Sequence, residues 1–110
     1  MTKKSPYADE CNVAYAMNII GGKWKIAIIW KLLDGRLRYS KLRYKLGNIS
    51  EGVLINQLKE LEADAIVRRI DHKEIPPRVE YELTQRGENL RSALRQIDRW
   101  GAEIQSSSSI

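Results

Sequence analysis

The chain has 110 residues, 43% of them hydrophobic, and its 19 Lys and Arg against 14 Asp and Glu give a net charge of +5. This length suits a single domain, and the longest apolar run, residues 26–30, is far shorter than the roughly 20 residues of a membrane span. The first ten residues lack the apolar core of a secretory signal, and the single cysteine excludes an internal disulfide. A cytoplasmic protein without a membrane partner is expected.

The N-terminal part of the chain predicts an arm and two helices. Residues 1–8 are expected to form a flexible arm, followed by one domain over residues 9–105 and a frayed tail at 106–110. Asp9 is expected to cap a first helix over residues 9–20, where apolar residues recur at helical spacing before Gly21 and Gly22. The next segment, KWKIAIIWKLLDG, has a wide apolar stripe and predicts a second helix that ends at Gly35.

A basic run overlaps and follows the second helix. Residues 23–45 contain eight Lys and Arg and only one acid, Asp34. Within this run, RLRY suggests an isolated strand, and Ser40 is expected to cap a third helix that carries Leu42 and Leu46. Because a solvated surface usually mixes both signs, the run favours an anionic partner such as a nucleic-acid backbone.

The segment NISEGVLINQLKELEADAIVRR, residues 48–69, predicts a fourth helix from Ser50 to about residue 64. On a helical wheel, three residues fall within about 40° of Leu54 and define a buried face: Leu58, Leu61 and Ala65. The opposite face carries Gly52, Ile55, Asn56 and Lys59. The front half is nearly uncharged, which an ordinary amphipathic helix or a DNA-contacting helix would explain equally well. The basic run before it and the hairpin after it favour DNA contact.

The remaining sequence predicts a β-hairpin and a final helix. Alternating and β-branched residues on either side of KEIPP indicate a ribbon over residues 67–84. Thr84 is expected to cap a helix over residues 85–105 with an apolar stripe. The predicted fold class is α+β, mostly α: a winged helix-turn-helix, with the hairpin as its wing and with additional N- and C-terminal dimerisation helices.

In helix-turn-helix proteins the N-terminal part of the recognition helix contacts base edges. The residues expected to contact bases are Ser50, Gly52, Ile55, Asn56 and Gln57. Those expected to contact phosphates, or DNA from the wing, are Lys23, Arg36, Arg38, Lys41, Arg43, Lys45, Lys59, Lys73 and Arg78. Lys23 is equally well explained as a solvated side chain, and one of these cations is available for an ion pair with Glu80 or Glu62.

The first and last helices carry more apolar surface than one small domain can bury, so we expect a homodimer. The expected interface residues are Val13, Met17, Ile20, Leu90, Leu94, Ile97, Trp100 and Ile104. The sequence thus predicts a homodimeric regulator that binds specific double-stranded DNA. The alternative is a winged-helix module that binds protein without sequence-specific DNA contact.

Catalysis, metal binding and cofactors are not expected. The single histidine, His72, cannot make a metal site without further ligands, and no phosphate-binding glycine loop is present. We expect His72 to be exposed to solvent or to contact backbone. From its neighbours alone, Cys11 is expected to be an inert packed thiol. A second interpretation, a sensor of an oxidant or another small effector, rests on a resemblance to a known family.

Several motifs together resemble the HxlR family of winged-helix regulators, relatives of the MarR type. They are Cys11, IIGGKWKIAIIWKLLDG, LRYSKL, IS at 49–50, LKELEADAIVRR, IPPRVEYELTQRG and Trp100. The resemblance runs from about residue 11 to residue 102. The resemblance implies dimeric DNA binding near promoters, and a thiol sensor near position 11 in some members. Ala65 replaces a usual glycine in the turn after the recognition helix, so that turn is expected to differ. Gly52 and Ile55 also depart from the family pattern, so base preference cannot be transferred from relatives.

Overall fold

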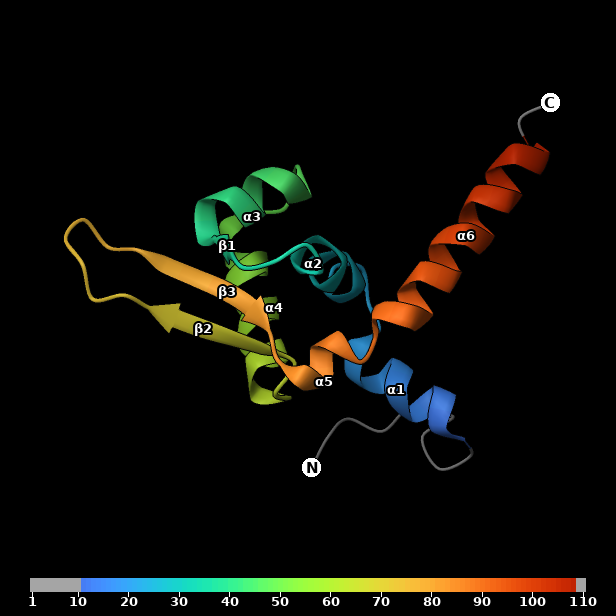
Figure 1. Cartoon of the computed structure of the whole chain (residues 1–110), viewed down its shortest axis with the longest axis horizontal. Helices are drawn as coiled ribbons and strands as arrows, with labels where there is room; N and C mark the ends of the chain where they lie inside the picture. The colour runs from blue at the N-terminus through green and yellow to red at the C-terminus, as the bar shows by residue number, and fades with distance from the viewer. Residues whose placement is uncertain (1–10, 109–110) are drawn as a thin grey trace.

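The computed structural model describes residues 11–108 as a helical domain with a small antiparallel sheet. The predicted fold class, a winged helix-turn-helix, is confirmed (Figure 1). The helices are α1 (Asn12–Ile20), α2 (Lys25–Leu32), α3 (Tyr39–Leu46), α4 (Glu51–Ala63), α5 (Gln85–Glu88) and α6 (Arg91–Ser108). The strands are β1 (Leu37–Arg38), β2 (Val67–Asp71) and β3 (Val79–Leu83). The expected arm at residues 1–8 and the expected cap at Asp9 lie outside the described residues.

The sheet has the order β1-β3-β2, and both pairs are antiparallel. Residues 37–38 therefore form an edge strand of the wing sheet, not an isolated strand, with Leu37 opposite Tyr81 and Arg38 opposite Glu80. In the wing, Arg69 is opposite Tyr81 and Ile70 is opposite Glu80. Because strand side chains alternate between the two faces, Arg69 and Tyr81 share one face, and Arg38 and Glu80 share the other.

The core lies where α2, α3 and α4 pack together against the sheet. Its fully buried side chains include Ile28, Ile29, Leu32, Leu42, Leu54, Leu58 and Leu61. The predicted leucine face of α4 is thus the face that packs into the domain. This packing exposes the opposite face of α4 to solvent. None of the helices within residues 11–108 is both long enough and apolar enough to cross a membrane.

The turn after α4 keeps the left-handed geometry that was expected to change. Ala65 has a φ of 61°. The N–H of Ile66 donates to the Leu61 carbonyl at 2.8 Å, and the N–H of Ala65 donates to the Glu62 carbonyl at 3.0 Å. These two bonds form a Schellman motif, which normally has glycine at the left-handed position. The expectation of a different turn was therefore wrong: Ala65 takes the glycine conformation.

Helix termini also differ from the prediction. Cys11 is the N-cap of α1, and its Sγ accepts a hydrogen bond from the N–H of Ala14 at 3.4 Å. Thr84 is an N-cap as predicted, with Oγ1 accepting from the N–H of Gly87 at 3.2 Å. The helix that it begins stops after one turn, because the N–H of Leu90 bonds the Gly87 carbonyl three residues back and not the carbonyl four back. A separate helix, α6, then runs to Ser108, beyond the predicted end at residue 105.

In Figure 1, α6 projects away from the body of the molecule, on the side opposite the wing tip. Its exposed apolar side chains are Ile97 (53% exposed), Trp100 (63%) and Ile104 (45%). Two residues expected in a dimer interface are instead buried in the subunit's own core: Ile20 and Leu94. They are buried because the end of α1 and the start of α6 both pack against the body. Leu90 is half-buried against the same core.

Candidate DNA interface

The front of α4 is exposed and nearly free of charge. Ser50 begins the helix, and its Oγ accepts a hydrogen bond from the N–H of Val53 at 3.2 Å. Gly52, Ile55 and Asn56 are exposed, whereas Gln57 is half-buried. The geometry therefore brings four of the five predicted base-contacting residues to the surface of one helix end.

Val53 was missed by the sequence analysis, although it is 42% exposed on the same front turn. Its position one residue before the buried Leu54 was the available signal. Val53 and Ile55, which is 38% exposed, place two branched apolar side chains beside Asn56. Such side chains suit contact with the methyl group of thymine, and an asparagine amide suits the edge of adenine.

An ion pair between a buried lysine of α2 and the half-exposed Glu60 links this helix to the rest of the domain. Lys25 is 8% exposed, and its Nζ lies 2.6 Å from the Glu60 carboxylate. The other Glu60 oxygen accepts a hydrogen bond from Asn56 Nδ2 at 3.4 Å. Lys25 Nζ also donates to the Ile19 carbonyl at 3.4 Å, at the end of α1. The sequence analysis did not assign roles to Lys25 and Glu60, because their distant positions gave no signal of contact.

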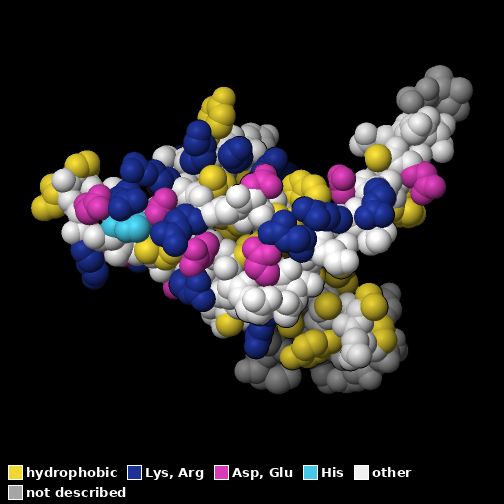
Figure 2. All heavy atoms as spheres, viewed as in Figure 1, with side chains coloured by type: hydrophobic (Ala, Val, Ile, Leu, Met, Phe, Trp, Pro, Cys, Tyr) yellow, Lys and Arg dark blue, Asp and Glu magenta, His cyan; other side chains and the backbone are white. Residues whose placement is uncertain are grey.

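The predicted phosphate-contacting residues divide into two groups. Those that are exposed and make no ion pair with another described residue are Arg38, Lys41, Lys45, Lys59 and Lys73. Lys23 is exposed too, with its Nζ 5.1 Å from the centre of the Trp24 ring. Figure 2 shows many Lys and Arg side chains around α3 and the wing, interspersed with acids.

The second group is neutralised or engaged within the subunit. Arg36 lies 3.7 Å from the Glu80 carboxylate and 3.3 Å from the Glu82 carboxylate, as the expectation of one internal ion pair allowed. Arg78 donates two hydrogen bonds to Glu74, at 3.1 and 3.0 Å. Arg43 donates to the Ile49 carbonyl at 3.5 Å. Arg36 and Arg78 are therefore partly neutralised by acids, and the Arg43 guanidinium keeps its charge but is held at a backbone carbonyl, so all three are less available to a phosphate than the first group.

His72 was expected to be exposed to solvent or to contact backbone. Its backbone N–H does contact backbone, since it donates to the Arg78 carbonyl at 3.0 Å. Its side chain is only 19% exposed, and its Nε2 lies 2.6 Å from the Glu80 carboxylate. This hydrogen bond is the main cause that lowers the pKa of Glu80, with smaller contributions from the charges of His72, Arg78 and Arg36. The wing thus has a polar cluster centred on Glu80.

No group of three or more potential metal ligands occurs within residues 11–108.

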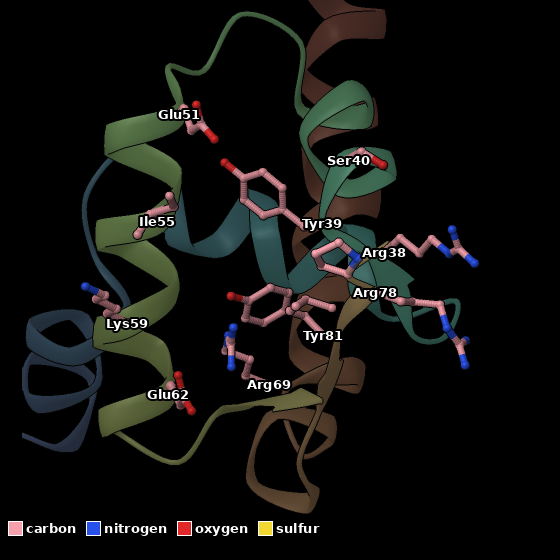
Figure 3. A pocket seen from close by; sticks show the side chains of 12 residues that line it. Arg38, Tyr39, Ser40, Glu51, Ile55, Lys59, Glu62, Arg69, Arg78 and Tyr81 are labelled. Atoms are coloured by element: carbon pink, nitrogen blue, oxygen red, sulfur yellow. The ribbon is translucent and has the colours of Figure 1, made fainter. Parts of the chain in front are cut away.

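A trough of about 600 Å³ lies between α4 and the sheet. Figure 3 shows Glu51, Ile55 and Glu62 of α4 facing Tyr39, Tyr81 and Arg69 across it. Burial raises the pKa of both tyrosines: Glu51 raises that of Tyr39 further, and Arg69 opposes the shift at Tyr81. The hydroxyl of Tyr39 is buried and has no hydrogen-bond partner in the described part of the chain.

A recognition-type helix with an exposed front, preceded by a helix and followed by a β-ribbon, defines a winged-helix transcriptional regulator. A model of the HxlR-like helix-turn-helix family matches residues 19–109. The chain belongs to that family.

Relatives with known sequences or structures agree with this class. The HTH-type transcriptional regulator YtcD of Bacillus subtilis is 42% identical over 91 residues, which cover 83% of this chain and 72% of YtcD. A MarR-family transcriptional regulator structure from Porphyromonas gingivalis W83 has a TM-score of 0.83 and 37% identity, covering 92% of this chain and 97% of that one. The redox regulator HypR in its oxidised form has a TM-score of 0.79 and 39% identity, covering 84% and 96% of the two chains.

Proposed function

We propose that this regulator binds a pseudo-palindromic DNA duplex as a homodimer, with α4 in the major groove and the wing on the flanking backbone or minor groove. The observation that carries the proposal is the exposed, nearly uncharged front of α4, which is preceded by cations that form no ion pair with another described residue, such as Lys41 and Lys45. A front whose only charge is that of Glu51 can approach base edges with little repulsion from phosphates, whereas the adjacent cations gain by replacing counterions on the backbone.

The dimer would place two α4 helices about 34 Å apart, one turn of DNA. Its interface would use the exposed apolar residues of α1 and α6. After the correction for Ile20 and Leu94, this set contains Val13, Met17, Ile97, Trp100 and Ile104. Each of the five is at least 45% exposed in the single subunit. Burying them against a second copy would remove a large apolar area from water.

Cys11 is the proposed thiol-responsive residue. It is exposed at the start of α1, and HypR, a structural neighbour, is itself a redox regulator. An oxidant such as diamide would take two electrons and two protons from a pair of Cys11 thiols, which would leave one disulfide between two subunits. Non-reducing electrophoresis after diamide treatment, with Cys11→Ser as control, tests this assignment.

Gel shifts on a cognate and a scrambled duplex test the DNA assignment. Asn56→Ala should cost about 1–3 kcal/mol on the cognate site and relax specificity at one position, because it removes a base contact. Lys59→Ala should weaken binding to both duplexes alike, because phosphate is common to both. Equal and negligible effects of the two changes would locate the base-contacting helix elsewhere.

Salt dependence separates the two groups of cations. If each subunit places four to five cations on phosphates, log affinity should fall against log salt with a slope of about −7 to −9. Lys45→Gln should reduce that slope, whereas Arg36→Gln should change it less because Arg36 already pairs with Glu80 and Glu82. A wild-type slope shallower than about −3 would contradict backbone contact by the basic run.

A further inference from the structure

The tip of the wing carries an apolar side chain that no other described residue covers. Ile75 is 99% exposed, more than any other large hydrophobic side chain in the described chain. Pro76 and Pro77, which follow it, are exposed as well. Figure 2 shows hydrophobic side chains at this end of the molecule, at the left. An isolated exposed hydrophobic residue is ordinary on a protein surface, so the setting of Ile75 decides whether it has a role.

The loop around Ile75 is held by hydrogen bonds between its two arms. The backbone N–H of His72 donates to the Arg78 carbonyl at 3.0 Å and closes the ribbon at the base of the loop. Above it, Arg78 donates from Nε and Nη2 to the two carboxylate oxygens of Glu74, at 3.1 and 3.0 Å. This bidentate contact lowers the pKa of Glu74 and raises that of Arg78, so both groups stay charged and bound to each other.

The backbone of the loop is restricted on both sides of Ile75. Pro76 and Pro77 follow it, and the proline ring fixes φ. Before it, Lys73 has a left-handed backbone with a φ of 56°, and its N–H donates to the Asp71 carboxylate at 2.9 Å. The Ile75 side chain is therefore presented by a loop that has little freedom left to lose on binding.

The acids beside the tip are engaged, whereas one cation is available. Asp71 accepts the N–H of Lys73, and Glu74 is paired with Arg78. The Lys73 side chain is exposed and forms no ion pair with another described residue. The loop thus presents an apolar side chain next to a positive charge. The minor groove of DNA suits both, since phosphates flank it and apolar side chains can insert between its base steps.

The length of the ribbon matches the spacing of the DNA grooves. Each wing strand has five residues, which extend roughly 16 Å at about 3.3 Å per residue. A major groove and the next minor groove are about half a turn, or roughly 17 Å, apart along the axis. In Figure 1 the wing tip lies on the side of the molecule opposite α6, so the proposed dimer interface leaves it uncovered.

We propose that Ile75 is an apolar wedge, a side chain that enters the flanking minor groove and inserts between two base pairs at a flexible pyrimidine–purine step. Lys73 contacts a phosphate beside that step. The inference rests on the proposed function, since it requires the wing to lie on the flanking minor groove. It adds a source of specificity: base steps differ in the energy needed to unstack them, so sequence is selected at a position where no base edge is contacted.

Fluorescence of 2-aminopurine tests the wedge, because this adenine analogue brightens when it loses stacking with its neighbours. The full chain first selects a duplex from a randomised pool, and the analogue is then placed in turn at each position of the two flanks. With wild-type protein at saturation, the fluorescence should rise at one step on each flank. A bound duplex that shows no such rise at any flanking position would overturn the proposal.

Variants at two neighbouring positions assign the rise to one side chain. Ile75→Ala should abolish the rise at saturating protein and weaken binding at least about threefold, whereas Ile75→Leu should keep most of it. Lys73→Gln is the matched control: it should weaken binding without changing the rise, because it removes only a phosphate contact. Both side chains are exposed, so the melting curves of all three variants should match wild type and show that each is folded. An undiminished rise with Ile75→Ala would refute the assignment.

A change in the DNA separates the wedge from the proposed function. Replacing the step at the site of the rise by AA should weaken wild-type binding at least about threefold, since a stiff step costs more to unstack. The same replacement should weaken Ile75→Ala less. Equal wild-type affinity for the two duplexes would contradict the wedge alone. Failure of the wild-type chain to select any duplex would contradict the proposed function, and the wedge with it.

Discussion

The ammonium of Lys25 in α2 lies 2.6 Å from the carboxylate of Glu60 in α4, so a buried charge on one helix is neutralised by the helix proposed to enter DNA. The two partners differ in exposure: the Lys25 side chain is 11% exposed and the Glu60 side chain 49%. Removing Glu60 therefore leaves a buried positive charge, whereas removing Lys25 leaves a negative charge that is half exposed to water.

We expect Glu60→Gln to destabilise the fold more than Lys25→Met. The first change leaves a buried ammonium without its counter-charge, and loss of a hydrogen bond to a charged group costs about 1–3 kcal/mol. The second change leaves a carboxylate that water can still solvate, and methionine fills much of the same space. Urea unfolding at fixed protein concentration measures both; a larger loss for Lys25→Met would contradict this order.

Ala65→Gly is expected to stabilise the protein. Ala65 has a φ of 61°, and a non-glycine residue in the left-handed region costs about 1 kcal/mol relative to glycine. The gain is partly offset by the greater freedom of glycine in the unfolded chain. Thermal melting should show a higher midpoint for Ala65→Gly and a lower one for Ala93→Gly, which introduces glycine inside α6. A lower midpoint for Ala65→Gly would mean that the turn is not strained.

The polar cluster of the wing predicts a dependence of stability on pH. The pKa of Glu80 is lowered, first by its hydrogen bond with His72, so the folded state favours the carboxylate. Its stabilising contribution is present above the unfolded-state pKa, about 4.3, and is lost as pH falls through the lower folded-state pKa. Glu80→Gln should therefore be less stable than wild type at pH 7, and the difference should shrink below about pH 4.

Denaturant unfolding of Glu80→Gln at pH 7, 5 and 3.5 provides that measurement, with Glu103→Gln as a control for the general loss of one negative charge. A difference from wild type that stays constant over this range would show that Glu80 ionisation does not contribute to folding.

The proposed dimer predicts that Ile97→Glu with Trp100→Glu yields monomers. Both side chains are more than half exposed in the single subunit, so the double change places two charges in the interface without disturbing the subunit's core. Light scattering should give about twice the 12.7 kDa chain mass for wild type and the single-chain mass for the variant. A wild-type monomer at micromolar concentration would overturn the dimer and weaken the DNA proposal. Ser92→Glu, with an exposed side chain near the start of α6, is the control.

The elements with strong periodicity were predictable from sequence. The leucines of α4 repeat at helical spacing and define its buried face, and the alternation in residues 79–83 defines the wing strand. The break between α5 and α6 was not predictable, because the apolar stripe continues through it. At the start of α6, just after this break, Arg91 donates a hydrogen bond to the Leu33 carbonyl at 2.7 Å. Leu33 lies 58 residues earlier in the chain, so no local pattern could predict this contact.

The candidate site shows the same limit. The exposure of Gly52, Ile55 and Asn56 followed from the wheel, since it depends only on local geometry. An ion pair between one cation of the basic run and Glu80 was expected, but that Arg36 makes it depends on how the strands meet. The same holds for the contacts of His72 with Glu80 and of Lys25 with Glu60, which were not expected. Likewise, Ile20 and Leu94 became core residues because of where α1 and α6 pack, which no local pattern encodes.

Because α6 projects from the body of the subunit, the helical order of its far half should depend on dimerisation and therefore on protein concentration. This helix has 18 residues, and its first turn is anchored to the subunit through Arg91 and the buried Leu94, whereas Ile97, Trp100 and Ile104 are exposed. An isolated helix of this length is marginal in water. If a second copy covers the remainder, amide hydrogen exchange in residues 97–108 should slow as protein concentration rises, while exchange in α4 should not. Hydrogen exchange in the far half of α6 would then report the fraction of the protein that is dimeric.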